Sequence, residues 1–348
     1  MTKIAINGMG RIGRLITRRY LSDPPKGIEL VAGNDLDPTD NIAYLIRYDS
    51  VHGRAPFEVE AQGDTLRCGE QKLQIFHEPD PAKLPWKDLG VDIVLECTGL
   101  FRDRTKAAKH LEAGASKVII SAPSSNADHT IVFGVNHKDY DPGKDHIVSA
   151  ASCTTNSLAP VLKVLNDTFG IDSAMATTIH AYTSSQKLVD SSARKRRRGR
   201  AAAVSLIPTS TGAANATVQV IPELEGKIHA TAIRAPVPDG AITDITAYLK
   251  QDVTEGTVNG ALEGACRGEL QGVMGYSEED LVSVDVITDP RSSIVDAQST
   301  KVVGNRAVKV LAWYDNEYGF SCRMLDLAAY MAEKGGMKVG ATEAPIKA

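Results

Sequence analysis

A single cysteine lies among hydroxyl side chains in the stretch "AASCTTNSLAP". Ser152 and Thr154 flank Cys153, and an apolar pattern with helical spacing follows. A helix N-terminus stabilises the thiolate, which is the nucleophilic form of cysteine, so we expect a lowered pKa for this thiol. A lone cysteine is more often a small buried apolar residue, but such a residue needs no polar neighbours. We therefore interpret Cys153 as a nucleophile and expect burial for the others: Cys68, Cys97, Cys266 and Cys322.

A thiol nucleophile needs a base, and His180 is a candidate. It lies near the end of the apolar stretch "AMATTIHAYT", at the boundary of a strand and a loop. Spacing alone does not select it from the 8 histidines of the chain. Paired with Cys153, it could activate the thiol and stabilise a developing oxyanion. The thiolate could attack an aldehyde to form a hemithioacetal, whose oxidation would leave a thioester.

A glycine-rich turn near the N-terminus indicates the oxidant. In "NGMGRIG", Gly8, Gly10 and Gly13 follow a short apolar strand and open a helix. This context is typical of a dinucleotide-binding turn, in which glycines allow a tight bend and close approach of a pyrophosphate. Asp35 ends the next strand, about 20 residues further on, where a carboxylate binds the ribose hydroxyls of NAD. The two features together predict NAD as cofactor and hydride transfer as the chemistry.

The first half of the chain alternates strands and helices. We expect helices over residues 11–21 and 104–115, between strands over residues 3–7, 28–35, 91–99, 117–124 and 146–152. Apolar strands that alternate with helices favour a parallel sheet with both faces covered. The fold class is therefore α/β, with a Rossmann-type doubly wound parallel sheet in residues 1–152.

The second half has fewer helices between its strands. We expect strands over residues 174–183, 229–237, 241–250, 281–288 and 307–315. This rhythm predicts an α+β catalytic domain, residues 153–319, with a mixed or antiparallel sheet. A C-terminal helix within residues 320–348 is expected to pack back onto the first domain. The polar, basic segment 184–203 is expected to be a long functional loop.

Composition excludes several classes of protein. The net charge of −4 gives no positive field for nucleic acid. Five cysteines without a CxxC pair indicate a reducing compartment and no structural metal site. We find no apolar stretch near the roughly 18 residues that span a bilayer, and "MTKIAINGMG" does not have the pattern of a signal peptide. A cytoplasmic enzyme without a metal is the expectation.

Several motifs in register resemble the phosphorylating glyceraldehyde-3-phosphate dehydrogenase family. They are "INGMGRIGR", "YDSVHGR", "ECTGLF", "ASCTTN", "HAYT", "STGAA" and "WYDNE", and they extend over essentially the whole chain. The resemblance implies a homotetramer of two-domain subunits that oxidises glyceraldehyde 3-phosphate with NAD and inorganic phosphate. Cys153 matches the family's nucleophile, and His180 matches its base and the activator of the oxidation step.

The resemblance also implies binding residues for each ligand. Those for the cofactor are Gly8, Gly10, Arg11, Ile12, Gly13, Asp35, Thr98, Gly99, Ser121 and Asn316. Those for the substrate phosphate are Thr183 and Arg234. Those for inorganic phosphate are Ser152, Thr154, Thr211, Gly212 and one arginine of the run 196–200. Among these arginines we prefer Arg198. Hydroxyls, backbone N–H groups and arginine are suitable partners for phosphate oxygens. "PTSTGAA" is also compatible with a plain helix cap.

Some positions leave alternatives open. Asp35 favours NAD, whereas Ser191 and Ser192 replace the bulky residues typical of strictly NAD-dependent members, so measurable use of NADP is expected. Ser157 stands where many members have a second cysteine. The nearest alternative is erythrose-4-phosphate dehydrogenase, although the intact "TSTGAA" favours a site for inorganic phosphate. A Cys/His hydrolase is disfavoured by the dinucleotide turn, and a non-enzymatic role by the presence of every catalytic position.

Overall fold

The computed structural model describes residues 1–336, and its N-terminal part is built on a nine-stranded sheet. The strands lie in the order β10-β11-β9-β8-β1-β2-β7-β6-β5. Pairing is parallel from β10 to β7 and antiparallel for β6 and β5 at the edge. The bounds are β1 Thr2–Asn7, β2 Ile28–Asn34, β5 Val59–Gln62, β6 Thr65–Cys68, β7 Gln71–Phe76, β8 Ile93–Glu96, β9 Lys117–Ile120, β10 His129–Thr130 and β11 Ile147–Ser149.

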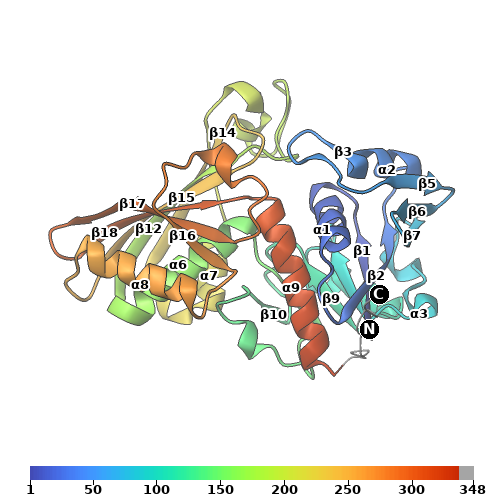
Figure 1. Cartoon of the computed structure of the whole chain (residues 1–348), viewed down its shortest axis with the longest axis horizontal. Coiled ribbons are helices and arrows are strands. Elements are labelled where there is room, and N and C mark those ends of the chain that lie inside the picture. The colour runs from blue at the N-terminus through green and yellow to red at the C-terminus, as the bar shows by residue number, and fades with distance from the viewer. Residues whose placement is uncertain (337–348) are drawn as a thin grey trace, which may run out of the picture.

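Helices cover both faces of this sheet, as expected for a doubly wound fold. They are α1 Arg11–Ser22, α2 Thr39–Arg47, α3 Trp86–Leu89, α4 Arg104–Ala107, α5 Lys109–Glu112 and α9 Tyr318–Lys334, and a short hairpin joins β3 Tyr48–Asp49 to β4 Gly53–Arg54. Figure 1 shows α9 beside α1, and the core contains Ile6, Ile16 and Met324. Since β2 and β8 pair with opposite edges of β1, the strand order reverses there, and such a switch point is where ligands bind.

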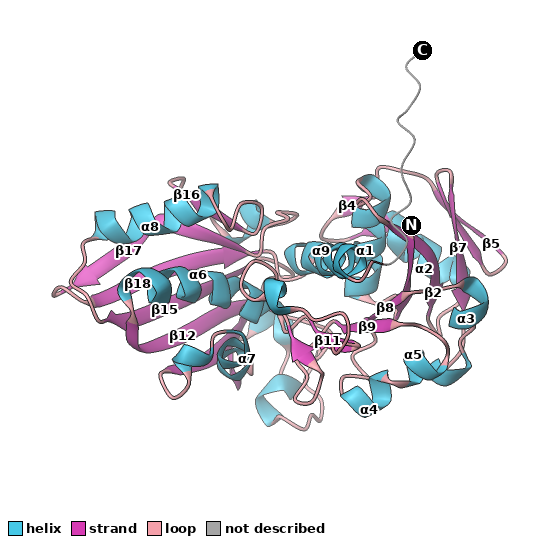
Figure 2. Cartoon of the chain, turned by 90° about the horizontal axis from the view of Figure 1, so that it is seen from below, coloured by secondary structure: helices cyan, strands magenta, loops and turns pink. Residues whose placement is uncertain are grey.

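The second part is a seven-stranded mixed sheet in the order β13-β14-β12-β15-β18-β17-β16. Its strands are β12 Ile171–Ala181, β13 Ile207–Ser210, β14 Ile228–Ala235, β15 Ala241–Leu249, β16 Met274–Ser277, β17 Ser293–Val303 and β18 Ala307–Tyr314. The helices α6 Cys153–Phe169, α7 Ala213–Val220 and α8 Glu255–Arg267 lie against one face (Figure 2). The opposite face exposes Met175 and Tyr248. The expected fold class, a doubly wound α/β domain with a second α+β domain, is confirmed.

One expected strand is wrong. Residues 281–288 contain the 3₁₀-helix Ser283–Val286 instead of a strand, because the carboxylate of Asp285 accepts a hydrogen bond from the Val282 N–H at 2.8 Å and closes a turn. The alternating valines of this segment imitate a strand, yet Val282 and Val284 are exposed. β18 pairs with the expected strand β15 on one side and with β17 on the other, and β17 was missed together with β13, β16 and the β5–β7 meander.

Other boundaries differ in detail. The helix expected over 104–115 is two one-turn helices, α4 and α5, and the basic loop contains 3₁₀ turns at Arg196–Gly199 and Ala202–Val204. The expected C-terminal helix is present as α9 up to Lys334, whereas residues 337–348 lie outside the described part. The domain limits 1–152 and 153–319 stay a prediction. Among residues 1–336, no helix has the length and apolar character that crossing a membrane requires.

Candidate active site

Cys153 and His180 lie together although they come from different elements. Cys153 is the first residue of α6, whose N-cap is Ser152, and His180 lies near the end of β12. The Cys153 Sγ and His180 Nε2 atoms are 3.4 Å apart. This distance suits proton exchange between thiol and imidazole. The two residues line one pocket with Thr183, Arg234 and Asn316.

The other nitrogen of His180 has two partners. His180 Nδ1 lies 2.7 Å from the Ala181 carbonyl oxygen and 2.6 Å from Arg234 Nη1, which also donates to that carbonyl at 2.8 Å. Burial, followed by the charge of Arg234, lowers the pKa of His180 to about 3. The imidazole is therefore neutral at physiological pH and can accept a proton.

The thiol of Cys153 differs from the expectation. Burial raises its pKa, and the charge of Arg234 and hydrogen bonds from Thr154 oppose this effect without reversing it. The lowered pKa expected from the helix N-terminus is therefore wrong, because loss of hydration costs the thiolate more than its neighbours return. At neutral pH the pair is a thiol beside a neutral imidazole, so nucleophilic attack needs proton transfer to His180.

Asn316 presents an open hydrogen-bonding position in this pocket. Its side chain is 5% exposed, and its Oδ1 atom is buried without a hydrogen-bond partner in the described residues. A buried acceptor without a donor is costly, and the carboxamide of a nicotinamide could supply that donor. Three further predicted cofactor residues line the same pocket, namely Arg11, Ile12 and Ser121.

The remaining cofactor residues surround a second pocket at the switch point. Gly8, Gly10, Asp35 and Thr98 line it. A Cβ on Gly8 would lie 2.6 Å from the Thr98 nitrogen, whereas one on Gly10 would meet nothing within 4 Å. Gly8 therefore allows close strand packing, while Gly10 leaves room for a ligand at the uncapped N-terminus of α1. The residues fit a dinucleotide.

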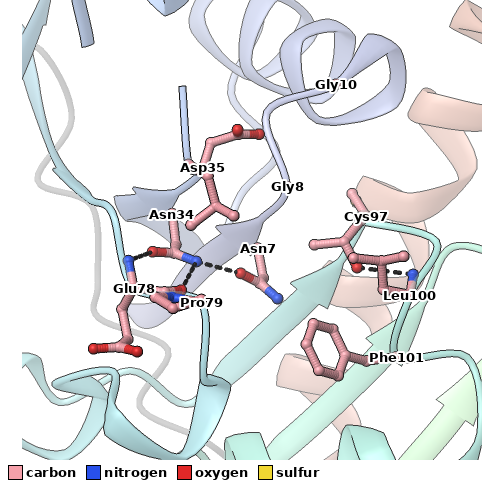
Figure 3. A pocket seen from close by; sticks show the side chains of 12 residues that line it. Asn7, Gly8, Gly10, Asn34, Asp35, Glu78, Pro79, Cys97, Leu100 and Phe101 are labelled. Atoms are coloured by element: carbon pink, nitrogen blue, oxygen red, sulfur yellow. Dashed lines mark hydrogen bonds between the residues drawn. The ribbon is translucent and has the colours of Figure 1, made fainter. Parts of the chain in front are cut away.

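Two more glycines of the prediction have structural positions. A Cβ on Gly13 would lie 2.0 Å from the Gly8 carbonyl oxygen, so this glycine lets α1 pack on the turn and lies behind the pocket. Gly99, which follows Thr98, has a positive φ of 71° and does not line either pocket. The Asp35 carboxylate faces the turn (Figure 3). It accepts a hydrogen bond from Met9 N at 2.6 Å.

The guanidinium of Arg11 does not point to a phosphate. It pairs with Asp49 at 2.5 Å and with Glu317, to which Nε also donates at 3.0 Å. Only the main-chain N–H groups of Arg11 and Ile12, at the start of α1, remain for a pyrophosphate. The side chain instead links α1 and the β3–β4 hairpin to the loop that carries Asn316.

The residues predicted to bind inorganic phosphate are more dispersed. Ser152 lines the catalytic pocket, but its hydroxyl also accepts from Thr155 N at 3.1 Å. The Thr154 hydroxyl is buried against the Tyr314 hydroxyl at 3.0 Å. Arg198 donates to Thr209 Oγ1 at 3.0 Å. Thr211 and Gly212 precede α7, outside the pocket around Cys153.

A buried polar network lies beneath the pocket at the switch point, which we call the adenosine pocket because the adenosine half of NAD is its predicted ligand. The sequence analysis missed this network. Glu96 is 1% exposed and accepts four hydrogen bonds: Asn7 Nδ2 at 2.6 Å, His110 Nε2 at 3.1 Å, Thr98 N at 2.8 Å, and the Thr98 hydroxyl. Trp86 Nε1 donates to His110 Nδ1 at 3.0 Å, which requires a neutral imidazole with its proton on Nε2. Asn34 Nδ2 donates a hydrogen bond to Asn7 Oδ1, and Asn34 Oδ1 accepts one from Glu78 N (Figure 3). The sequence signal that could have revealed this network is the presence of polar residues, Asn7 and Glu96, inside otherwise apolar strands.

A second buried group brings together residues far apart in the chain. Donor atoms of His52, Asp239 and Asp315 lie within 4.8 Å of one another. Spacing along the chain gave no sign of this group, which only the fold assembles, and the expectation of an enzyme without a metal stays a prediction. The other cysteines behave unevenly: Cys68 and Cys322 are buried as expected, whereas Cys97 and Cys266 are only partly buried.

Fold and site together define an NAD-dependent oxidoreductase with a cysteine beside its cofactor cleft. Residues 2–104 match the family model for the glyceraldehyde 3-phosphate dehydrogenase NAD binding domain, and residues 152–316 match that for the C-terminal domain. The chain belongs to the glyceraldehyde-3-phosphate dehydrogenase family, and NAD is its cofactor.

Curated relatives named glyceraldehyde-3-phosphate dehydrogenase cover nearly the whole chain. The protein of Geobacillus stearothermophilus is 52% identical over 333 residues, which are 96% of this chain and 99% of the relative. That of Zymomonas mobilis is 50% identical over 333 residues, 95% of this chain and 98% of the relative. That of Mycobacterium avium is 48% identical over 336 residues, with the same two coverages. These names give no support to the erythrose-4-phosphate dehydrogenase alternative.

Proposed function

We propose that this protein oxidises D-glyceraldehyde 3-phosphate with NAD and inorganic phosphate to 1,3-bisphosphoglycerate, in glycolysis or gluconeogenesis. The observation that carries the proposal is the 3.4 Å approach of Cys153 Sγ to His180 Nε2 in the pocket that Asn316 lines. A nucleophile, its base and the partner of a nicotinamide carboxamide thus share one cavity. The relatives named above support the same reaction.

His180 serves as base in the first step. When its Nδ1–H donates to the Ala181 carbonyl, Nε2 presents a lone pair to the Cys153 thiol. The thiol proton moves to Nε2 as sulfur attacks the aldehyde carbon. The protonated imidazole then passes this proton to the resulting oxyanion, which completes the hemithioacetal and leaves His180 neutral. The charge of Arg234 beside Nδ1 disfavours the imidazolium, so His180 releases the proton readily in a later step.

Oxidation converts the hemithioacetal into a thioester on Cys153. Bound NAD would supply the hydride acceptor for this oxidation. His180 removes the hemithioacetal hydroxyl proton, and Asn316 orients the ring through its buried amide. Pairing of Cys153 with a neutral base allows both proton transfers without an additional residue.

Two anion sites flank the thiol in this proposal. Thr183 and Arg234 line the pocket and suit the phosphate of the substrate. Ser152, Thr154, Thr211, Gly212 and Arg198 are proposed for the phosphate that releases the acyl group. Arg198 lies close enough to add to the positive field that lowers the pKa of His180, which supports its choice over Arg196, Arg197 and Arg200. Thr154 must turn from Tyr314 to reach the anion.

We propose a preference for NAD with measurable use of NADP. Asp35 borders the adenosine pocket, where its charge would repel a 2′-phosphate. Ser191 and Ser192 are exposed and small, so they present no steric barrier. The ratio of kcat/KM for the two cofactors tests this proposal. A preference for NADP would contradict the role of Asp35.

We propose a homotetramer in the cytoplasm. The uncovered sheet face exposes Met175 and Tyr248, and the basic loop separately exposes Leu188 and Val204. Two distinct apolar surfaces supply the two kinds of interface that a symmetric tetramer needs. The five cysteines are free thiols, which suits a reducing compartment. Light scattering on the full chain tests the assembly, and Met175→Glu should yield smaller oligomers.

The reaction is tested by following NADH formation with glyceraldehyde 3-phosphate. Rapid turnover is expected only with inorganic phosphate present, because phosphate must release the thioester. Replacing the substrate by erythrose 4-phosphate should reduce the rate strongly. Equal rates with and without phosphate would contradict the proposed acyl transfer.

A further inference from the structure

Asp239 is a buried carboxyl group that the proposed reaction does not use. It follows β14 in the turn "PVPDG" and is 1% exposed. Neither of its oxygens accepts a hydrogen bond from any described residue. The following Gly240 has a φ of +81°, and its Cβ position lies 2.1 Å from the Ser283 carbonyl oxygen. The turn therefore lies tightly against the Ser283 backbone, with Asp239 on its buried side.

The groups that face Asp239 are mostly acidic. Asp315 and Glu317 approach from the loop between β18 and α9, and His52 approaches from the β3–β4 turn. His52 Nε2 is 3.4 Å from Asp239 Oδ2, which is longer than an ordinary N–H···O hydrogen bond. The charge of Arg11 is committed to Asp49 and Glu317. No cation is therefore directed at Asp239 among the described side chains.

The hydrogen bonds show which acid carries a proton. Asp315 accepts from Thr288 N at 2.7 Å, Glu317 N at 2.8 Å and Tyr318 N at 2.6 Å. Three N–H donors favour an ionised Asp315. Asp239 has no donor, so it is the member of the pair that ionises with more difficulty.

Burial, together with the charges of Asp315 and Glu317, raises the pKa of Asp239 to about 9. Glu317 behaves differently: burial would raise its pKa, but the nearby His52 ring and the hydrogen bonds from Arg11 outweigh burial and lower it. Two adjacent carboxyl groups that share one proton are the expected outcome.

We propose that Asp239 is a positioning residue that remains protonated in the native protein and donates its proton to Asp315. Asp315 precedes Asn316 and accepts backbone hydrogen bonds from Glu317 and Tyr318, which follow it, and from Thr288 of another loop, so it fixes the loop that carries Asn316. The shared proton therefore removes a repulsion that would otherwise push this loop apart. The inference rests on the proposed role of Asn316 in binding nicotinamide.

Thermal unfolding of the full chain from about pH 6 to about pH 10 tests the proton directly. Asp239 is protonated when folded and ionised when unfolded, so unfolding releases a proton and wild-type stability falls as pH rises toward 9. Asp239→Asn keeps a donor to Asp315 but does not titrate. Its Tm should exceed that of wild type by a margin that grows with pH and levels off above about 9. Asp244→Asn, which removes a carboxylate paired with Lys309 at 2.8 Å, is the control and should show no such growth.

NAD binding to the same proteins, measured by calorimetry, tests the positioning role without catalysis. The Kd of wild type should rise several-fold above about pH 9, whereas that of Asp239→Asn should change little. Asp239→Ala, which lacks the donor, should bind NAD weakly at every pH. These readouts hold whether or not glyceraldehyde 3-phosphate is the substrate.

Three results would overturn the inference. A constant Tm difference between wild type and Asp239→Asn would mean that Asp239 is ionised in the native state. A rise in Tm of wild type alone on addition of MnCl₂ or ZnCl₂ would mean that a cation occupies the group of acids. If the Tm difference between wild type and Asp239→Asn grew with pH while the two proteins bound NAD equally well, Asp239 would be protonated in the native state but would not position Asn316.

Discussion

The floor of the adenosine pocket and the catalytic pocket both bury ionisable side chains, but they satisfy them differently. Glu96 receives four hydrogen bonds, and His110 has a partner on each ring nitrogen. In the catalytic pocket, Arg234 Nε and Asn316 Oδ1 lack partners among residues 1–336, and the Cys153 thiol lies beside a neutral base. Beneath the adenosine pocket, the protein itself fills the hydrogen-bonding capacity of the buried polar groups. In the catalytic pocket, some buried donors and acceptors remain free for a ligand.

The difference shows how each region works. A saturated network has one low-energy arrangement, so the Glu96 group fixes Asn7 and Thr98 at the switch point before any ligand arrives. Free donors and acceptors cost stability, yet they are what a substrate, a phosphate or a nicotinamide can bind. Changes in the catalytic pocket should therefore reduce activity, and changes beneath the adenosine pocket should reduce stability.

The largest effect is expected at the nucleophile. Cys153→Ala removes the atom that carries the acyl group, so kcat/KM should fall by at least about 10⁴-fold. Since Cys153 belongs to the unsaturated region, unfolding by urea should change little. Cys266→Ala, at a partly buried cysteine far from the pocket, is the control and should retain activity. Comparable activity of Cys153→Ala and wild type would exclude covalent catalysis.

Arg234→Gln should produce the next largest effect. Loss of the charge proposed to face the substrate phosphate should lower kcat/KM by about 10³-fold. Arg234 also lowers the pKa of Cys153, so alkylation of the thiol by iodoacetamide should begin at higher pH in the variant. Arg267→Gln, at an exposed arginine paired with Glu263, should leave both properties unchanged. An unshifted alkylation profile would show that this charge does not reach the thiol.

The comparison also explains what the sequence could predict. Periodicity located β1, β2, β12 and six further strands, namely β8, β9, β11, β14, β15 and β18, because apolar residues must alternate or run together in a buried strand. The segment 281–288 has the same pattern but lies on the surface, where a carboxylate can close a turn instead. Cys153 and His180 could be paired only by chemistry, since tertiary packing alone determines their separation.

Buried polar contacts between distant segments could not be predicted. Asn7, Glu96 and His110 lie on separate elements, and only the sheet order places them together. Asp239 and Asp315 meet because β15 pairs with β18, so that the turn before β15 lies beside the end of β18. A local pattern carries no information on such pairs. The raised pKa of Cys153 was missed for the same reason, because burial depends on the whole fold.

In the saturated region, Glu96→Gln should reduce the free energy of unfolding by about 3 kcal/mol. An amide can accept hydrogen bonds only through its oxygen, so its NH₂ group would face donors. Trp86 requires the Nδ1 lone pair of His110, and therefore this ring cannot reverse its tautomer to compensate. Urea denaturation measures the loss, and NAD affinity should fall with it. A fully stable variant would show that the network is not saturated.

The smallest effect is expected for Thr98→Val, which removes one of the four donors to Glu96 at nearly constant volume. The carboxylate retains its bonds to Asn7, His110 and the Thr98 backbone, so the cost should be about 1 kcal/mol. Thr65→Val removes a hydroxyl that donates to the neutral Gln74 amide at 3.3 Å, and should cost less. Because removing one donor leaves the others in place, the loss in Thr98→Val should be well below that in Glu96→Gln. Equal losses would mean that the Thr98 hydroxyl alone holds the carboxylate, and the contrast between the two regions would then rest on a single bond.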